Sequence, residues 1–379
     1  MRFPEFHGEW EKCKLGDIAE FSTARISSVK LDCKNYVSTE NMLQDFQGVV
    51  EAKSVPNETN VISFTCGDIL ISNIRPYLKK VWKATFDGGC SSDVFVLQAT
   101  DTVAKDYLHY AVANDKFINY VMSGAKGVKM PRGDKNQMRT YQLSLPSIQE
   151  QYKIAKLLTL LDERIATQSK LIEDLKKLKS AIIDYAINSL DTDFAKFGSL
   201  YEMAGEGGTP TTSNASFYDN GKIPFVKIDD LKKKYLTENN DFITELGLQK
   251  SSAWLVPTRS ILFSNGATIG EITITTYPVC TKQGILGIVP KPNIDVEFLY
   301  YFMSSSYFKK AVSRIVTEGT MKTVYLKDIN NIRCPIPTKE KQLDIAKMPS
   351  ALNSKIDFEQ SILKLFGSQK QYLLRQMFM

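Results

Sequence analysis

The chain has 379 residues and a net charge of +6, and its sequence is 43% hydrophobic and 24% charged. This length predicts two or three domains with sizeable cores, and the balance of residue types excludes a disordered or fibrous protein. The positive charge suits a polyanionic partner without identifying one.

The first residues, 1–6, lack the apolar run of a signal peptide, and no segment has the roughly 18 uninterrupted apolar residues that span a bilayer. A cytoplasmic protein is therefore expected. The six cysteines are scattered without a CxxC pair, and only His7 and His109 could assist them as metal ligands. Reduced thiols are favoured over a zinc site, and no metal is expected.

Comparison of the sequence with itself reveals a duplication at an offset of about 191 residues. Residues 69–73 recur as residues 261–265, and both segments are typical of a buried strand that leads into a polar turn. Residues 107–110 recur as residues 298–301, with spacings that suit a short amphipathic helix. Each half therefore repeats the same elements in the same order.

The duplication is strongest where a long helical pattern begins. The matched residues are Pro146, Gln151 and Ile154–Lys156 in the first half, and Pro337, Gln342 and Ile345–Lys347 in the second. In both halves the proline precedes the helical pattern, as a helix-entry signal should. A looser match, at a smaller offset, sets residues 15–18 against residues 197–200.

The first helical pattern runs from about residue 149 to residue 190. Its apolar residues alternate spacings of four and three, which is a heptad seam interrupted by Gln168 and Lys179. A helix of this length is a rod of about 60 Å. The seam residues expected to pack helix on helix are Ile154, Leu158, Leu161, Ile165, Ile172, Leu175 and Ile182.

The second helical pattern, residues 339–379, is the weaker copy. Its seam residues are Ile345, Leu352, Ile356, Leu363, Phe366, Leu373 and Met377. Pro349 stands where the first copy has Leu158, so a kink or a late helix start is expected. Gly367 lowers the helix propensity in the middle of the pattern. The first helix is therefore the expected rigid spacer.

These patterns predict an α+β protein with an internal duplication. Two similar mixed α/β modules, residues 1–148 and 191–338, would be separated by two long antiparallel, coiled-coil-like helices, residues 149–190 and 339–379. The alternative for each pattern is an amphipathic helix that lies on a core. Two copies at equal spacing favour helices that pack on one another, with a pseudo-twofold relation between the modules. Such an object suits repeated half-sites along a DNA duplex.

The polar loops of the first module have the side chains that contact phosphates and base edges. The candidate DNA-binding residues are Asn73, Arg75, Tyr77, Lys79, Lys80, Lys126, Lys129, Arg132 and Lys135. The alternative for such a basic run is a solvated surface. Arg132 lies between Pro131 and Gly133, which favours a projecting loop over a helix face.

The second module has hydroxyl- and amide-rich loops instead. The candidate DNA-binding residues are Thr209, Thr211, Thr212, Ser213, Asn214, Asn265, Thr268 and Lys322. Gly207 and Gly208 would let the backbone approach a partner closely, although a plain surface turn fits equally well. The segments 73–78 and 265–270 occupy equivalent places with different side chains, as two modules with different half-sites would show, and as neutral drift would show too.

Motifs for catalysis are missing from the sequence. A methyltransferase would need a cofactor glycine loop and a proline-containing catalytic motif, and neither occurs; P-loop, HExxH and G-x-S-x-G motifs are also absent. With two histidines in the chain, histidine acid–base chemistry is not expected. No catalytic residue or cofactor is assigned, and a binding and scaffolding subunit is predicted.

The chain resembles the specificity subunits of type I restriction-modification systems. Residues 3–18 look like their usual start, and residues 67–80 look like the middle of a first target recognition domain. Residues 208–225 are similar to the entry into a second recognition domain, and residues 145–155 to the start of the central helical region. The resemblance covers essentially the whole chain.

The resemblance implies that each recognition domain reads one half of a bipartite DNA site while the helices fix the gap. It also implies two methyltransferase subunits that bind S-adenosylmethionine and methylate adenine, and two motor-nuclease subunits that use ATP and Mg²⁺. The chain itself would be non-catalytic. The alternative from another class is a coiled-coil adaptor with two ligand-binding heads that do not bind DNA; a self-sufficient methyltransferase is disfavoured.

Overall fold

The computed structural model describes residues 2–266, 268–316 and 322–378. It divides into two compact units, each with one globular module and a segment of each of two long helices. The first unit comprises residues 2–168 and 362–378, and the second comprises residues 169–361 where they are described. No helix in the described part of the chain is long and apolar enough to cross a membrane.

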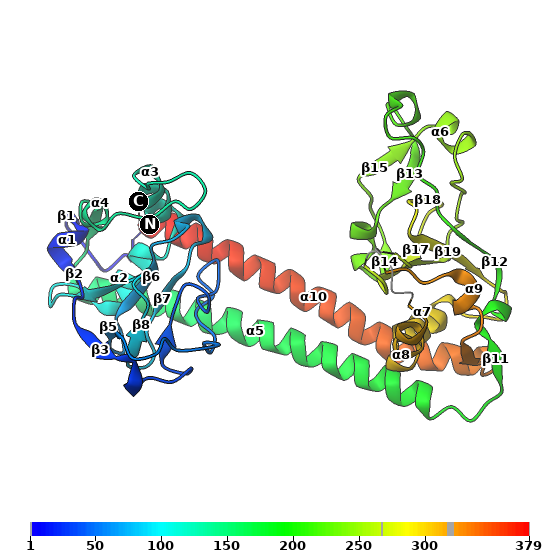
Figure 1. The fold of residues 1–379 in the computed structure, drawn as a ribbon, viewed down its shortest axis with the longest axis horizontal. Helices are drawn as coiled ribbons and strands as arrows, with labels where there is room; N and C mark the ends of the chain where they lie inside the picture. Colours follow the sequence, from blue (N-terminus) through cyan, green and yellow to red (C-terminus); the bar gives the residue numbers. More distant parts are fainter. Residues whose placement is uncertain (1, 267, 317–321, 379) are drawn as a thin grey trace. The chain divides into compact units, whose positions relative to one another are not determined.

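The first module is a mixture of short strands and short helices (Figure 1). Its strands are β1 (Glu11–Lys14), β2 (Ala19–Phe21), β3 (Arg25–Ser27), β4 (Tyr36–Val37), β5 (Asn60–Phe64), β6 (Ile69–Ser72), β7 (Val81–Lys83), β8 (Gly88–Cys90), β9 (Val94–Ala99) and β10 (Gln142–Leu145). Its helices are α1 (Leu15–Ile18), α2 (Lys105–Val112), α3 (Asp115–Ser123) and α4 (Lys135–Arg139), with 3₁₀ turns at Ser28–Lys30 and Pro76–Leu78.

The central sheet of this module has the strand order β2-β9-β6-β7, with antiparallel pairs throughout. Strand β6 lies inside this sheet and is buried at all its positions, which suits its run of apolar residues. A second sheet has the order β3-β5-β8-β4, and β1 pairs with β10. The predicted buried strand at residues 69–72 is therefore confirmed.

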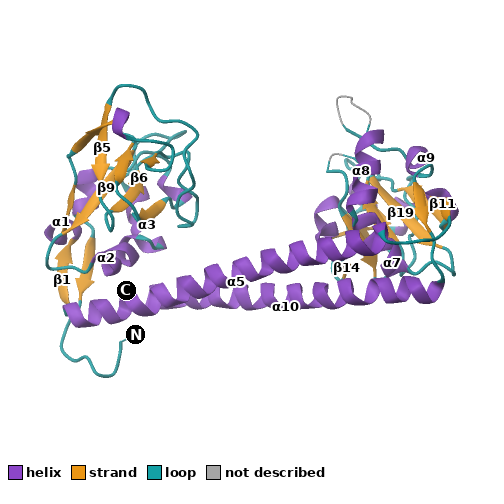
Figure 2. Cartoon of the chain, turned by 90° about the horizontal axis from the view of Figure 1, so that it is seen from below, coloured by secondary structure: helices purple, strands orange, loops and turns teal. Residues whose placement is uncertain are grey.

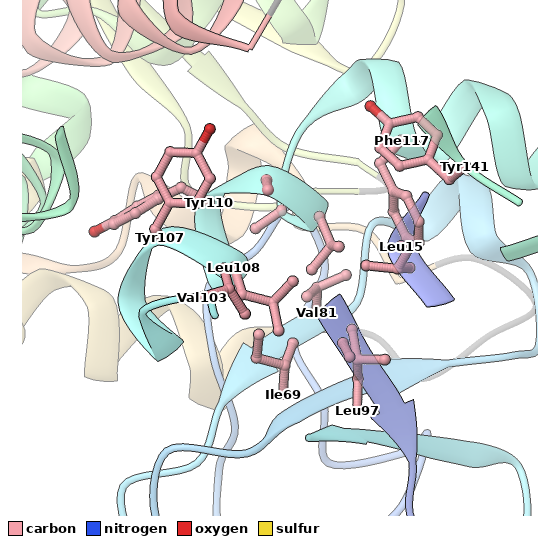
Figure 3. Close-up of a cluster of buried hydrophobic side chains, with 14 of the residues drawn as sticks. Leu15, Ile69, Val81, Leu97, Val103, Tyr107, Leu108, Tyr110, Phe117 and Tyr141 are labelled. Atoms are coloured by element: carbon pink, nitrogen blue, oxygen red, sulfur yellow. The ribbon is translucent and has the colours of Figure 1, made fainter. Parts of the chain in front are cut away.

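The main core of the first module lies between the central sheet and helices α2 and α3. Figure 3 shows Tyr107 and Leu108 of α2 beside Ile69, Val81 and Leu97 of the sheet, all of them buried. At roughly 25 cal/mol for each Å² of apolar surface removed from water, such side chains supply most of the stabilisation of the module.

The second module repeats this arrangement. Its strands are β11 (Phe194–Lys196), β12 (Tyr201–Glu206), β13 (Ile223–Val226), β14 (Tyr235–Leu236), β15 (Asp241–Ile243), β16 (Ile261–Ser264), β17 (Ile272–Thr275), β18 (Cys280–Thr281), β19 (Ile285–Pro290) and β20 (Arg333–Pro335). Its helices are α6 (Glu245–Gln249), α7 (Val296–Ser304), α8 (Ser306–Ile315) and α9 (Leu326–Ile329), with 3₁₀ turns at Phe197–Ser199, Ala215–Phe217 and Ile228–Lys232.

The two modules share one topology. The main sheet of the second module has the order β12-β19-β16-β17-β14, in which the first four strands correspond to β2-β9-β6-β7. A smaller sheet has the order β15-β13-β18, and β11 pairs with β20 as β1 pairs with β10. Strand β16 is buried at all its positions, like β6. The duplication predicted from the sequence is therefore confirmed.

Two long helices, α5 (Ile148–Asn188) and α10 (Lys339–Met377), contribute to both units (Figure 2). In the first unit they run antiparallel, because Asp162 pairs with Lys370 at 2.5 Å while Arg164 lies over the ring of Phe366. This orientation agrees with the prediction.

The second unit contains the other ends of the same helices. There Lys179 Nζ donates a hydrogen bond of 2.9 Å to Asn353 Oδ1. The side-chain amide of Asn353, on the other helix, therefore provides a hydrogen-bond acceptor for Lys179, the polar residue that interrupts the apolar seam. Burial lowers the pKa of Lys179, with smaller contributions from nearby lysines.

The seam residues of both helices face away from solvent. Those that are buried are Ile154, Leu158, Ile172, Ile356, Leu373 and Met377, and those that are half-buried are Leu161, Ile165, Leu175, Ile182, Ile345, Leu352, Leu363 and Phe366. Ile154 and Leu158 also belong to the core of the first module. The sequence pattern missed Ile183 and Ile187, which pack into the core of the second module.

Helix α10 corrects one expectation. It begins at Lys339 and continues through Pro349 and Gly367, so the late helix start is wrong, while the kink at Pro349 stays a prediction. Proline removes one backbone hydrogen bond, but burial of one helix face stabilises a long helix more than propensity does. Here Ala346 and Ile356, on either side of the proline, are both buried. Met379, the last residue of the pattern, lies outside the described residues.

A polar cluster joins the second module to α10. Lys234 Nζ donates hydrogen bonds to Glu297 Oε2 at 2.8 Å and to Ser350 Oγ at 2.9 Å, and the Lys234 side chain is only 2% exposed. The hydroxyl of Tyr301 also contacts Ser350 Oγ, at 3.1 Å. Burial alone would raise the pKa of Glu297, but hydrogen bonds from Lys234, Ser350 and Tyr235 hold it below its usual range.

The first module has a related cluster on α5. The hydroxyl of Tyr110, the counterpart of Tyr301, lies 3.3 Å from Thr159 Oγ1 and donates to Asp162 Oδ2 at 2.9 Å. Each module is therefore joined by a tyrosine to the long helix that follows it in the sequence.

Candidate nucleic-acid interface

Loops at the end of the central strand form the candidate site in each module. In the first module they are the β6 loop, residues 73–80, and the α4 loop, residues 124–134. In the second module the equivalent segments are the β16 loop, residues 265–270, and the described part of the α9 loop, residues 322–325. Ala267 lies outside the described residues.

Backbone hydrogen bonds hold the β6 loop against the α4 loop. The N–H of Gly133 donates to the carbonyl of Asn73 at 2.8 Å, and the N–H of Arg75 donates to the carbonyl of Pro131 at 2.7 Å. The N–H of Asn73 donates to the carbonyl of Asp93, in the turn before β9. The structure therefore brings Asn73, Arg75 and Arg132 together from two distant segments of the sequence.

The β6 loop has a tight turn that exposes two side chains. Arg75 and Lys79 adopt left-handed backbone conformations, with φ of 49° and 54°, on either side of the 3₁₀ turn Pro76–Leu78. This conformation is uncommon for residues other than glycine. Arg75 and Tyr77 are exposed, and 47% of the surface of Tyr77 is accessible.

Three of the predicted lysines are engaged within the protein. Lys79 pairs with Asp115 at 2.8 Å, and Lys80 Nζ donates to the carbonyl of Thr39 at 2.5 Å. Burial, with a smaller contribution from Arg75, lowers the pKa of Lys80. Lys135 lies 4.7 Å from the ring centroid of Phe95, and its pKa is also lowered, chiefly by burial.

The other cations of the α4 loop are exposed. Lys126 and Arg132 lie 3.7 and 3.6 Å from Asp134 and Asp93, and their side chains are 85% and 58% exposed. Lys129 is exposed as well. Ion pairs as long and as exposed as these are weak. Lys126 and Arg132 can therefore leave their carboxylate partners and bind a phosphate instead.

The β16 loop of the second module is held in the same way. The N–H of Val324 donates to the carbonyl of Asn265 at 2.8 Å, and the N–H of Asn265 donates to the carbonyl of Gly284 at 3.0 Å. These bonds correspond to the ones that Asn73 makes with Gly133 and Asp93. Thr268 and Lys322 are exposed on this scaffold.

Asn73 and Asn265 are alike in one further respect. Both side-chain oxygens are buried and have no hydrogen-bond partner within the described part of the chain. Asn265 is 1% exposed, and its amide nitrogen donates to the carbonyl of Val324 at 3.1 Å. These two asparagines hold the loops in shape, and the exposed neighbours are better placed to contact a ligand.

The hydroxyl-rich loop of the second module joins the same site through Thr209. Thr209 Oγ1 accepts a hydrogen bond of 3.3 Å from the N–H of Gln283, next to Gly284. The remaining predicted residues of this loop, Thr211, Thr212, Ser213 and Asn214, are exposed. Asn214 also caps a 3₁₀ turn through the N–H of Ser216.

Gly207 and Gly208 pack tightly against other parts of the second module. Both are buried, and a Cβ atom would lie 2.2 Å from the Thr281 carbonyl at Gly207 and 2.3 Å from Ser252 Oγ at Gly208. The chain itself therefore requires glycine at these positions. The expectation that these glycines let the backbone approach a partner closely stays a prediction.

Two contributors to the site were missed by the sequence analysis, namely Asp93 and Gly284. Their backbones anchor the β6 and β16 loops from the turns before β9 and β19. Asp93 and Gly284 are separated by the same offset as the rest of the duplication. Their equivalence could therefore have been found from the sequence.

Comparison with known proteins decides the family. Residues 7–177 and 191–365 each match the family model of the type I restriction modification DNA specificity domain. The chain belongs to this family. Together the two matches cover both modules and most of both long helices, so the specificity domain is present twice.

Two relatives of this specificity subunit match along most of their length. The MjaVIII type I specificity subunit of Methanocaldococcus jannaschii is 24% identical, with 94% of this chain and 90% of the relative covered. A putative type I specificity subunit of Mycoplasma pneumoniae is also 24% identical, with coverages of 87% and 85%. This chain is therefore a DNA specificity subunit of the type I restriction-modification class, and an adaptor that does not bind DNA is not favoured.

A solved structure shares the fold of this specificity subunit. The S subunit of a type I restriction-modification system from M. genitalium is 16% identical, with 100% of this chain and 99% of that chain covered and a TM-score of 0.60. The predicted α+β fold, with two similar modules and two long helices, is confirmed.

Proposed function

We propose that each module is a target recognition domain that reads one half of a bipartite DNA site. The modules are assigned to residues 1–148 and 191–338, and the helical spacers to residues 149–190 and 339–379. The observation that carries this proposal is the shared scaffold with different side chains. Asn73 and Asn265 have matching backbone hydrogen bonds, while the exposed side chains that follow them differ: Arg75 and Tyr77 in the first module, and Thr268 in the second.

The chemistry of the exposed side chains suggests that some of them provide affinity for DNA phosphates and others recognise the base sequence. In the first module, Arg132 and Lys129 supply charge for phosphates, and Arg75 has the planar fork that pairs with guanine. In the second module, Thr211 and Asn214 supply hydroxyl and amide groups that suit base edges or the backbone. Lys79, Lys80 and Lys135 are assigned to the loop's own structure.

The chain acts as the non-catalytic, sequence-reading component of a cytoplasmic complex. The long helices fix the gap between the half-sites and dock two methyltransferase subunits, and two motor-nuclease subunits join them. S-adenosylmethionine, ATP and Mg²⁺ bind to these partner subunits. The support for this assembly is the membership of the family, together with the two long helices that extend beyond the modules.

Exchange of one module tests the proposal. Residues 1–148 are replaced by the first module of a related specificity subunit, and methylated adenines are mapped by single-molecule sequencing in cells that contain the partner subunits. One half of the methylated sequence should change while the other half and the gap remain. The reciprocal exchange of residues 191–338 should change the opposite half. Change in both halves, or in neither, contradicts the proposal.

A further inference from the structure

The N-terminal segment of the first unit, residues 2–10, is an arm that packs against the first turns of α5. Arg2 donates hydrogen bonds from Nε and Nη2 to the two carboxylate oxygens of Glu150, at 2.9 and 2.8 Å. The Glu150 side chain is 0% exposed. Lys153, one helical turn further along, forms an ion pair with Glu5.

Aromatic side chains complete the contact between the arm and the helix. The ammonium of Lys153 lies 4.8 Å from the ring centroid of Phe3 and 5.9 Å from that of Phe6. Phe3 and Trp10 pack against the core of the first module. The arm therefore covers the start of α5 with a base, an acid and aromatic rings. Figure 2 shows the N-terminal loop beside this end of α5.

The second unit has an open groove at the corresponding place. Its volume is about 630 Å³, and its walls include Tyr185, Leu190, Lys341, Asp344 and Met348. The duplication matches Lys341 to Glu150 and Asp344 to Lys153. The described residues of this unit contain no counterpart of the arm, because the chain passes from the end of α5 at Asn188 to β11 at Phe194.

The groove has apolar walls and a reversed charge pattern. Tyr185 is 78% exposed and Met348 is 59% exposed, although both are large and apolar. Lys341 replaces the acid of the first unit, and Asp344 replaces the base. Asp344 forms a long and exposed ion pair with Lys347, at 3.8 Å.

We propose that this groove binds an extended segment of a partner protein, with aromatic side chains between an acid and a following base. The acid would pair with Lys341 and the base with Asp344, in the reverse order to Arg2 and Glu5 of the arm. The arm of a second copy of this chain does not fit, because Arg2 would face Lys341 and Glu5 would face Asp344. The site is independent of the loops that read DNA.

Two labelled peptides test this assignment on the full chain. One has the sequence of residues 1–10, and the other is the same peptide with Arg2→Glu and Glu5→Lys exchanged. Fluorescence anisotropy measures their binding to the wild-type chain and to the double variant Lys341→Glu/Asp344→Lys. The arm already in place blocks the first module, because an attached segment outcompetes a free peptide.

The charge-exchanged peptide should bind the wild-type chain about fivefold more tightly than the natural peptide, the factor expected from two partly exposed ion pairs. The double variant should reverse this preference. Circular dichroism of the variant checks that α10 is intact. Failure of both peptides to bind at millimolar concentration, or equal affinities that the variant leaves unchanged, overturns the proposal.

Discussion

Gln151 and Gln342 make the same set of hydrogen bonds in the two modules. Each side-chain oxygen accepts from a backbone N–H at the start of a helix, and each side-chain nitrogen donates to two carbonyls. The partners of Gln151 are Ala104, Thr102 and Pro146, and those of Gln342 are Asp295, Asn293 and Pro337. Both glutamines are 1% exposed. Each one fixes the entry into a long helix relative to the module before it.

Replacement of either glutamine by alanine should therefore destabilise its own unit. The change leaves a buried N–H at the start of α2 or α7 without a partner, which costs about 2 kcal/mol of unfolding free energy. Urea denaturation measures the loss, and hydrogen exchange at the start of each short helix locates it. Gln149→Ala, at an exposed position of α5, is the matched control. Equal loosening of both units by one substitution would refute this prediction.

In the cluster around Lys234, loss of Glu297 alone should lower the free energy of unfolding more than loss of both Lys234 and Glu297. Glu297→Leu leaves the buried ammonium of Lys234 without its carboxylate and should cost about 2 kcal/mol, less than a fully buried pair because Glu297 is 26% exposed. The double variant Lys234→Met/Glu297→Leu should recover most of this loss, because no charge remains buried. Urea denaturation of the single and double variants checks the prediction, and it fails if the double variant is the less stable of the two.

His109 should make the first unit sensitive to acid. Burial, with smaller contributions from Lys370 and Lys83, lowers the pKa of His109 to about 4 from an ordinary value of 6.5. Between these two pH values the unfolded chain binds the proton and the folded chain does not, so stability falls as the pH drops through this range. His109→Gln should reduce the difference in urea midpoint between pH 7 and pH 5. An unchanged difference would show that other groups cause the pH dependence.

Lys129 should contribute to DNA affinity without contributing to sequence choice. Its replacement by alanine removes about one phosphate contact, so the slope of log affinity against log salt concentration should fall by about 1 for both specific and unrelated duplexes. Lys156→Ala, an exposed lysine of α5, is the control and should leave the slope unchanged. A loss confined to the specific duplex would assign Lys129 to base recognition instead.

The spacing role of the helices predicts the effect of an insertion. Four residues added to α5 near Leu175 would lengthen that helix by about 6 Å. The gap between the two methylated half-sites should change while the half-sites themselves stay the same, as mapped by sequencing of methylated DNA. An unchanged gap would count against a spacer.

Repetition made much of this fold predictable. The segments around Ile69 and Ile261 were recognisable as buried strands because each is apolar throughout and leads into a polar turn. The seam from Ile154 to Ile182 was recognisable because its heptad spacing has few alternatives. In both cases the pattern along the chain is itself the cause of the structure.

The details of the site depended on contacts that the chain order does not reveal. Lys80 and Lys129 look alike in the sequence, yet one is engaged with the carbonyl of Thr39 and the other is exposed. Glycine is required at position 207 because the backbone there lies close to Thr281, a residue far along the chain. Pro349 indicated a late helix start because helix propensity is local, whereas the packing of the whole helix face depends on residues far apart in the chain.

The first unit is assembled from two widely separated parts of the chain. Leu373, Leu374 and Met377 at the end of α10 share a core with Leu158 and the first module. During synthesis, the ribosome makes these residues after those of the second module, so the first module waits for part of its core until the second module has been made. A messenger truncated before residue 362 would thus yield a chain whose earliest-made module has an uncovered apolar surface, a ready target for chaperones and proteases.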